Sequence, residues 1–224
     1  MKIAALNGSP RGESANSRQI ISLVQSFLPG TDWIIVAPCL KQAGYVDGQL
    51  GELFAADVLL IAFPLYVDGI PASFLHVLER YSEGYRLWRN GSGRGLPVQR
   101  VFAVANCGFH EGVQNRNALE QIALFCAGSG LDWCGGAGIG TGEMLRTMSS
   151  IPPEAGIRKP VTEALRSVAE AIRASPDDRL TGDIFTQHDI PWFLYKLAGE
   201  RGWLAKAKKN GVTRRDLDAR PLDG

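Results

Sequence analysis

The chain has 224 residues, of which 45% are hydrophobic, and its 24 basic and 23 acidic groups leave a net charge of +1. This length suits one α/β domain with an additional arm, and the balanced charge excludes a dedicated nucleic-acid-binding protein, which carries a strong basic excess. The sequence contains neither an uninterrupted apolar stretch of about 18 residues nor a signal-peptide pattern at its start, so we expect a cytoplasmic protein without a membrane partner.

Apolar runs with the character of buried strands alternate along the chain with segments of helical periodicity. We expect strands at 2–6, 33–37, 58–63, 101–105 and within 131–139. We expect helices at 16–28, 48–55, 71–88, 115–128 and 153–174. This alternation predicts right-handed βαβ units and a flavodoxin-like, doubly wound, five-stranded parallel α/β sheet of order 2-1-3-4-5. The expected domain covers 1–180, followed by a C-terminal helical extension over 181–224.

The loop after the first strand is rich in groups that bind a phosphate. It follows an apolar run, breaks at Gly8 and leads into the first helix, whose N-terminal backbone N–H groups favour an anion. The candidate phosphate ligands are Ser9, Arg11, Asn16 and Ser17. The alternative is an ordinary strand-to-helix turn in which Ser14 or Asn16 caps the helix. Neither a Walker A loop nor a G-x-G-x-x-G fingerprint is present.

The loop after the third strand suits a flat aromatic ligand. Prolines stiffen it at both ends, its backbone N–H groups can bond ring carbonyls, and Leu65 or Tyr66 can pack on a ring face. We expect Gly69 to have a positive φ and to allow close approach of the backbone to that ring. The candidate residues are Pro64, Leu65, Tyr66, Val67, Asp68 and Gly69. The alternative is a turn at the start of a helix, with Pro71 near the first helical position.

The loop after the fourth strand supplies a third set of candidates at the same sheet edge. They are Asn106, Cys107, Gly108, Phe109 and Gly112. A plain turn would account equally well for Asn106 and Gly108. His110 is assigned no acid–base role, since a single loop histidine commonly has none. In a doubly wound fold ligands bind where the strands end, so the coincidence of three such loops is stronger evidence than any one of them.

Together these three segments resemble the NADPH-dependent FMN reductase family, over roughly residues 1–145. The similarity rests on Gly8-Ser9-Pro10-Arg11 with Asn16-Ser17, on Pro64-Leu65-Tyr66 with Pro71-Ala72, and on Asn106-Cys107-Gly108 with Glu111-Gly112. The resemblance implies that FMN binds with its phosphate in the first loop and its ring between the other two. It implies hydride transfer from NAD(P)H through FMN to a flavin, a quinone or a similar small acceptor, with no catalytic side-chain acid or base.

Two further expectations concern metals and alternative functions. The four cysteines are scattered, and the cluster-binding motif of iron–sulfur relatives is missing, so no metal site is expected. The alternatives to an enzyme are a flavodoxin-type electron carrier without nicotinamide-dependent activity, and a flavin-free descendant. The near-neutral charge and the length favour the enzyme.

The aromatic tail from Pro191 to Lys209 predicts a helix that packs on a second subunit, which makes a homodimer the expected assembly. The alternatives are packing on its own domain or lying on a membrane surface.

Overall fold

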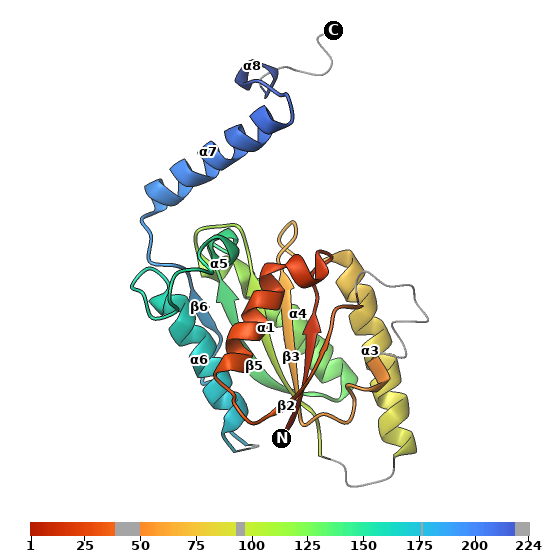
Figure 1. The fold of residues 1–224 in the computed structure, drawn as a ribbon. Coiled ribbons are helices and arrows are strands. Elements are labelled where there is room, and N and C mark those ends of the chain that lie inside the picture. Colours follow the sequence, from red (N-terminus) through yellow and green to blue (C-terminus); the bar gives the residue numbers. More distant parts are fainter. Residues whose placement is uncertain (39–49, 93–96, 176, 218–224) are drawn as a thin grey trace. The chain divides into compact units, whose positions relative to one another are not determined.

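The structure is a computed structural model that describes residues 1–38, 50–92, 97–175 and 177–217. The chain divides into two compact units, Met1–His188 and Asp189–Gly224. The first unit is a layered α/β domain, with helices on both faces of a central sheet (Figure 1). Residues 181–188, which the sequence analysis assigned to the extension, are therefore part of the sheet unit.

The sheet has six parallel strands in the order β2-β1-β3-β4-β5-β6. Their bounds are β1 Lys2–Asn7, β2 Asp32–Val36, β3 Val58–Pro64, β4 Arg100–Asn106, β5 Asp132–Ile139 and β6 Ile184–Thr186. The doubly wound class and the order of the first five strands are confirmed. The expected number of strands was wrong, because a sixth short strand extends the sheet beyond β5.

The sixth strand is held by backbone and side-chain contacts, since three residues are too few to bury much apolar surface. Ile184 to Thr186 pair with Ala137 to Ile139 in parallel register. Just before the strand, the Asp183 carboxylate accepts a hydrogen bond of 2.9 Å from the Gly136 N–H. Burial raises the pKa of Asp183 above its ordinary value. The strand brings residues 186–188 to the carboxyl edge of the sheet.

The helices of the first unit are α1 Asn16–Ser26, α3 Ala72–Gly91, α4 Arg116–Ser129, α5 Glu143–Thr147 and α6 Lys159–Arg173, with short 3-10 turns η1 Gly12–Ser14 and η3 Gly112–Asn115. The expected helix at 153–174 begins later, at Lys159, because residues 152–158 form turns closed by bonds such as Ala155 N–H to the Pro152 carbonyl. Residues 48 and 49 of the expected helix at 48–55 lie outside the described residues. Cys39 and Pro176 also lie outside them.

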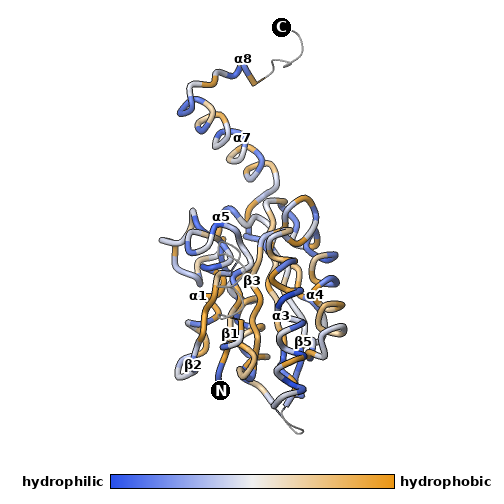
Figure 2. Tube along the Cα trace, turned by 90° about the vertical axis from the view of Figure 1, so that its right-hand side faces the viewer, coloured by the Kyte–Doolittle hydropathy of each residue, from blue (hydrophilic) through white to orange (hydrophobic). Residues whose placement is uncertain are grey.

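Alternate residues of the central strands face two separate cores. In β3, Leu59, Ile61 and Phe63 pack toward α3 and α4, whereas Val58, Leu60 and Ala62 pack toward α1 and α6. The side view shows the apolar strands enclosed between helices whose outer surfaces are more polar (Figure 2). A continuous apolar run is therefore what a central parallel strand requires, because both of its faces are covered.

The second unit consists of α7 Trp192–Lys209 and the short α8 Arg214–Leu217. The predicted helix in the tail is confirmed. The turn before α8 is closed by Asp216, whose carboxylate accepts bonds from the Thr213 N–H at 2.7 Å and the Thr213 hydroxyl at 2.6 Å. These bonds lower the pKa of Asp216. In the described part of the chain, no helix combines the length and the apolar character needed to cross a bilayer.

Arg100 ties the start of β4 to the end of α6. Its guanidinium is buried and donates to the carbonyls of Ala171 at 2.8 Å, Ile172 at 3.3 Å and Asp178 at 2.9 Å. These contacts satisfy carbonyls that a helix C-terminus otherwise leaves without partners. Arg100 thus closes the amino edge of the sheet, away from the candidate site.

We expect Arg100→Met to lower the free energy of unfolding by about 2–4 kcal/mol, because it leaves buried carbonyls unpaired. Urea denaturation of the purified variant measures this. The control is Arg80→Met, which removes a surface cation that lies 3.7 Å from Glu83 and should change stability by less than about 1 kcal/mol. Equal stability of the two variants would contradict the role given to Arg100.

Candidate functional site

The first loop leaves the N-terminus of α1 free of any side-chain cap. The N-cap residue is Ala15, with φ −80° and ψ 153°, and among the described residues no side-chain cap bonds to the first helical N–H groups. Ser14 instead donates to the Arg11 carbonyl at 3.0 Å, and Asn16 is the first helical residue. The capping alternative is therefore not what the structure contains. The helix end keeps its partial positive charge available for an anion.

The loop itself is shaped by Asn7, the last residue of β1. The Asn7 amide donates to the Gly12 carbonyl at 2.8 Å, and its oxygen accepts from the Ser9 N–H at 3.2 Å. The Ser9 hydroxyl then accepts from the Arg11 N–H at 3.2 Å. The 3-10 turn η1, Gly12–Ser14, lies between Arg11 and the helix. These local bonds hold Ser9 and Arg11 beside the uncapped helix end.

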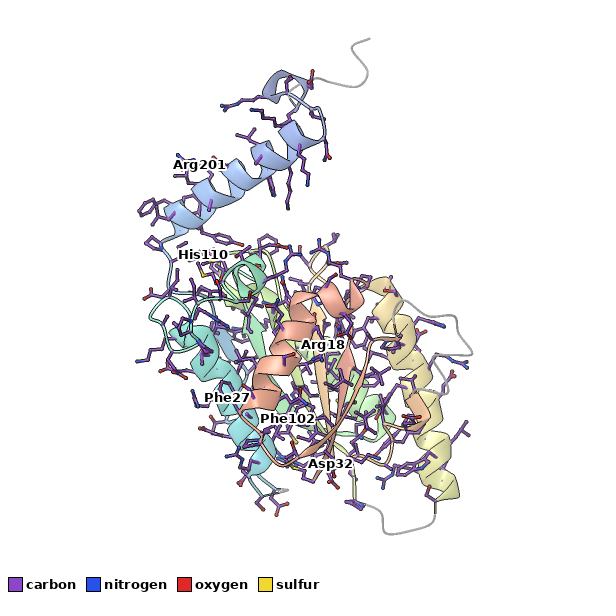
Figure 3. The ribbon with its side chains drawn as sticks, viewed as in Figure 1. Arg18, Phe27, Asp32, Phe102, His110 and Arg201 are labelled. Carbon is purple, nitrogen blue, oxygen red and sulfur yellow. The ribbon has the colours of Figure 1, made fainter. Side chains whose placement is uncertain are left out.

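Hydrogen bonds bring the three predicted loops to one place at the carboxyl edge. The Ser17 hydroxyl lies 3.5 Å from the Asn106 side-chain oxygen, which joins the first loop to the third. The Leu65 N–H donates to the Asn106 carbonyl at 2.8 Å, which joins the second loop to the third. Figure 3 shows His110 of the third loop at this edge, and Asp32 at the opposite edge. The meeting point is the switch between β1 and β3.

The second loop is a tight hairpin in which the positive φ angles lie at Val67 and Asp68, and not at Gly69 as predicted. Tyr66 and Gly69 exchange two backbone hydrogen bonds, of 2.9 and 3.1 Å. Between them Val67 and Asp68 have φ of +48° and +61°, the arrangement of a type I′ turn. The expectation that Gly69 supplies the unusual backbone conformation was wrong, because its φ is not positive. A β-branched residue with positive φ is a true outlier, and such strain clusters at functional sites.

Of the two side chains considered for a ring face, only Tyr66 is accessible. Leu65 is 9% exposed and belongs to the core under α3, whereas Tyr66 is 43% exposed. The Val67 side chain is fully exposed at the tip of the hairpin. Pro64, which ends β3, pairs in register with Asn106. The hairpin therefore presents Tyr66 and its own tip at the sheet edge.

The third loop combines a buried thiol with an exposed aromatic ring. The Cys107 thiol is 3.3 Å from the Asn115 amide nitrogen, and burial raises its pKa. Phe109 is 49% exposed, and the space beside the Gly108 Cα is open. His110 lies 3.8 Å from the Glu111 carboxylate. The raised pKa keeps the Cys107 thiol neutral, which does not suit a nucleophile.

A fourth loop, between β5 and α5, also reaches this edge, and the sequence analysis missed it. Its Gly142 N–H donates to the Cys107 carbonyl at 2.7 Å, and its Thr141 N–H donates to the Phe109 carbonyl at 2.6 Å. Glu143 follows, with its carboxylate 4.0 Å from Arg11 and 3.9 Å from Arg146. The run Gly138-Ile139-Gly140-Thr141-Gly142 at the end of the fifth strand was the signal available for it.

No group of three or more His, Cys, Asp or Glu residues that could hold a metal ion occurs in the part of the chain that the structure describes. Three cysteines are free and buried there, namely Cys107, Cys126 and Cys134. Burial raises the pKa of each thiol. Buried, neutral thiols are typical of structural cysteines.

Gly112 fixes how closely the third loop approaches its neighbours. A Cβ at this position would lie 2.2 Å from the Thr186 carbonyl oxygen and 2.6 Å from the Gly138 carbonyl oxygen. Gly112→Ala should therefore lower the free energy of unfolding by about 1–3 kcal/mol, as overpacking does. Gly108→Ala is the matched control from the same loop, because a Cβ there meets nothing within 4 Å. Urea denaturation compares the two, and unchanged stability of Gly112→Ala would contradict the packing.

Comparison with known proteins finds solved structures of the same fold. The chain is similar to an NAD(P)H:quinone oxidoreductase from Methanothermobacter marburgensis, with 13% identity and a TM-score of 0.52 over 78% of this chain and 98% of that one. It is also similar to a putative quinone reductase from Klebsiella pneumoniae, with 13% identity and a TM-score of 0.51 over 80% and 87% of the two chains. At such identities the likeness establishes the flavodoxin-like fold. The chain matches no protein-family model and no curated protein.

Proposed function

We propose that the chain is an FMN-dependent oxidoreductase related to the NADPH-dependent FMN reductases, passing hydride from NAD(P)H through FMN to a flavin, a quinone or a similar small acceptor. The observation that supports this most strongly is the uncapped N-terminus of α1 beside the hairpin at 65–69 and the loop at 106–112. The similarity to reductases of the same fold agrees with it.

The donor set fits a phosphomonoester. The Ser9 and Ser17 hydroxyls, the Asn16 amide and the α1 N–H groups offer hydrogen bonds, and Arg11 offers a planar fork that pairs with oxyanions. In the structure a carboxylate, that of Glu143, already lies 4.0 Å from the Arg11 guanidinium. This contact indicates that an anion is favourable at the position, and a phosphate ends FMN but not riboflavin.

The remaining residues would hold the ring and exclude water. Bound flavin supplies the redox chemistry, accepting two electrons as hydride and releasing them to a second substrate. The backbone of 65–69 and 106–109 would line the ring edge, and Tyr66 would cover part of a face. In this proposal the protein binds and orients the flavin, and no side-chain acid or base is required.

Arg11→Ala should weaken FMN binding by about 10-fold to 150-fold, the range expected when a charge-assisted hydrogen bond is lost. Fluorescence titration of the apo-protein with FMN and with riboflavin measures this. Riboflavin affinity should change little, because riboflavin lacks the phosphate. Arg86→Ala on α3 is the control, since Arg86 donates to Ser82 of the same helix at 2.9 Å.

The overall function is tested by adding NADPH, and separately NADH, to the flavin-loaded protein under nitrogen. We expect the flavin absorbance to bleach within the mixing time or seconds after it, and to return when a quinone is added. A protein that binds FMN but is not bleached by either nucleotide would be an electron carrier instead. A protein that binds no flavin at all would remove both proposals.

We also propose a homodimer, supported by the character of α7. Within its unit this helix buries none of its residues, although Trp192 is 56% exposed, Phe193 62% and Trp203 74%. Large apolar side chains gathered on one helix mark an interaction surface. We expect light scattering at micromolar concentration to give about twice the chain mass of 24.3 kDa, and deletion of 189–224 to give the mass of a single shortened chain. A full-length monomer would contradict the dimer and leave the flavin proposal intact.

A further inference from the structure

Thr141, in the loop between β5 and α5, has a backbone conformation that threonine rarely adopts. Its φ is +53°, and its side chain is completely buried. Positive φ is uncommon for non-glycine residues, among which Asn and Asp are enriched, and a β-branched residue with positive φ is a strained outlier. Such a conformation persists only where neighbouring contacts impose it.

His188 supplies those contacts from the end of the sheet unit. Its backbone N–H donates to the Thr141 hydroxyl oxygen at 3.0 Å, and its ring Nδ1 lies 2.8 Å from the same oxygen. The Thr141 hydroxyl thus contacts both the main chain and the side chain of His188. His188 is 1% exposed, so water does not compete for these bonds. The pair clamps the loop to the segment that follows β6.

The clamp is linked directly to the loop proposed to hold the flavin ring. The Thr141 N–H donates to the Phe109 carbonyl at 2.6 Å, and the next N–H, of Gly142, donates to the Cys107 carbonyl at 2.7 Å. A second link runs from Gly112, whose N–H donates to the Gln187 side-chain oxygen at 3.3 Å. The 106–112 loop is therefore supported by the backbone of residues 141–142 and by the side chain of Gln187.

Packing alone gives no reason for a histidine at position 188. Its Nε2 is buried and has no hydrogen-bond partner among the described residues. Burial and the nearby Arg158 lower the pKa of His188 to about 4, so the ring is neutral near pH 7. A buried polar atom without a partner destabilises the fold, and an apolar residue of similar volume would avoid that penalty. The bond from Nδ1 to Thr141 is the interaction that an apolar residue could not replace.

We propose that His188 is a positioning residue: it holds Thr141 in the left-handed conformation and so fixes the 106–112 loop against the flavin ring. This role rests on the proposed function, and it assigns the segment after β6 to the site although that segment contributes no ligand. His188 acts through Thr141 and does not itself touch the flavin.

The test compares two substitutions of His188, each of which can place a side-chain amide at the position of only one of the two ring nitrogens. The amide of His188→Asn can occupy the place of Nδ1 and keep the bond to Thr141, whereas that of His188→Gln reaches the place of Nε2 and loses it. We expect His188→Gln to weaken FMN and riboflavin equally, by about 10-fold, because the ring contact changes and the phosphate contact does not. His188→Asn should stay within about threefold of the wild type. His76→Gln, at an exposed position on α3, is the matched control.

A second substitution tests whether the strain at Thr141 is what His188 counteracts. Glycine adopts positive φ without strain, so Thr141→Gly should restore flavin affinity in the His188→Gln background. Hydrogen exchange of the apo-protein gives a readout independent of the flavin: His188→Gln should speed exchange of the Thr141 and Gly142 amides selectively. Unchanged exchange and unchanged affinity would overturn the proposal. Failure of Thr141→Gly to rescue would also overturn it. If the wild type binds no flavin, the exchange result still decides the clamp, while the proposed function fails separately.

Discussion

The close approach of backbone to backbone at the carboxyl edge is the constraint on which the rest of this structure depends. A Cβ on Gly140 would lie 2.2 Å from the His110 carbonyl oxygen, and one on Gly142 would lie 2.7 Å from the Cys107 carbonyl oxygen. Only glycine permits such contacts. They let the loops after β4 and β5 bond directly to each other and to the residues after β6. The geometry of this edge is therefore determined by main-chain atoms, which vary less than side chains do.

Electrostatics at the same edge are arranged around one helix end. The first turn of α1 offers N–H groups without a capping side chain, and Arg11 adds a full positive charge beside them. Glu143 partly neutralises that charge, because it lies between Arg11 and Arg146 at 4.0 and 3.9 Å. All three side chains are about half-exposed, so solvent screens the pairs and each contributes little to stability.

The sequence predicted the central architecture because its signals were long. Val58 to Phe63 form an unbroken apolar run, and β3 covers that run in the centre of the sheet. The three residues of β6 carry no periodicity and were therefore missed. At the site, hydroxyls, an amide and an arginine in one loop were recognisable as a group. The positive φ at Val67 and the burial of Leu65 were not, since both follow from how the hairpin between Tyr66 and Gly69 closes in three dimensions.

The helix α7 has a property that bears on any partner that covers it. It contains Gly199 and Gly202 in its interior, and a Cβ at either position would meet no atom within 4 Å. Glycine destabilises a helix interior by about 1 kcal/mol relative to alanine, and a helix in a protein owes most of its stability to the packing of one face. Association would then include part of the helix–coil transition of α7 itself. The heat capacity change of association would then be larger in magnitude than that of rigid docking. The affinity between the partners would fall steeply on warming.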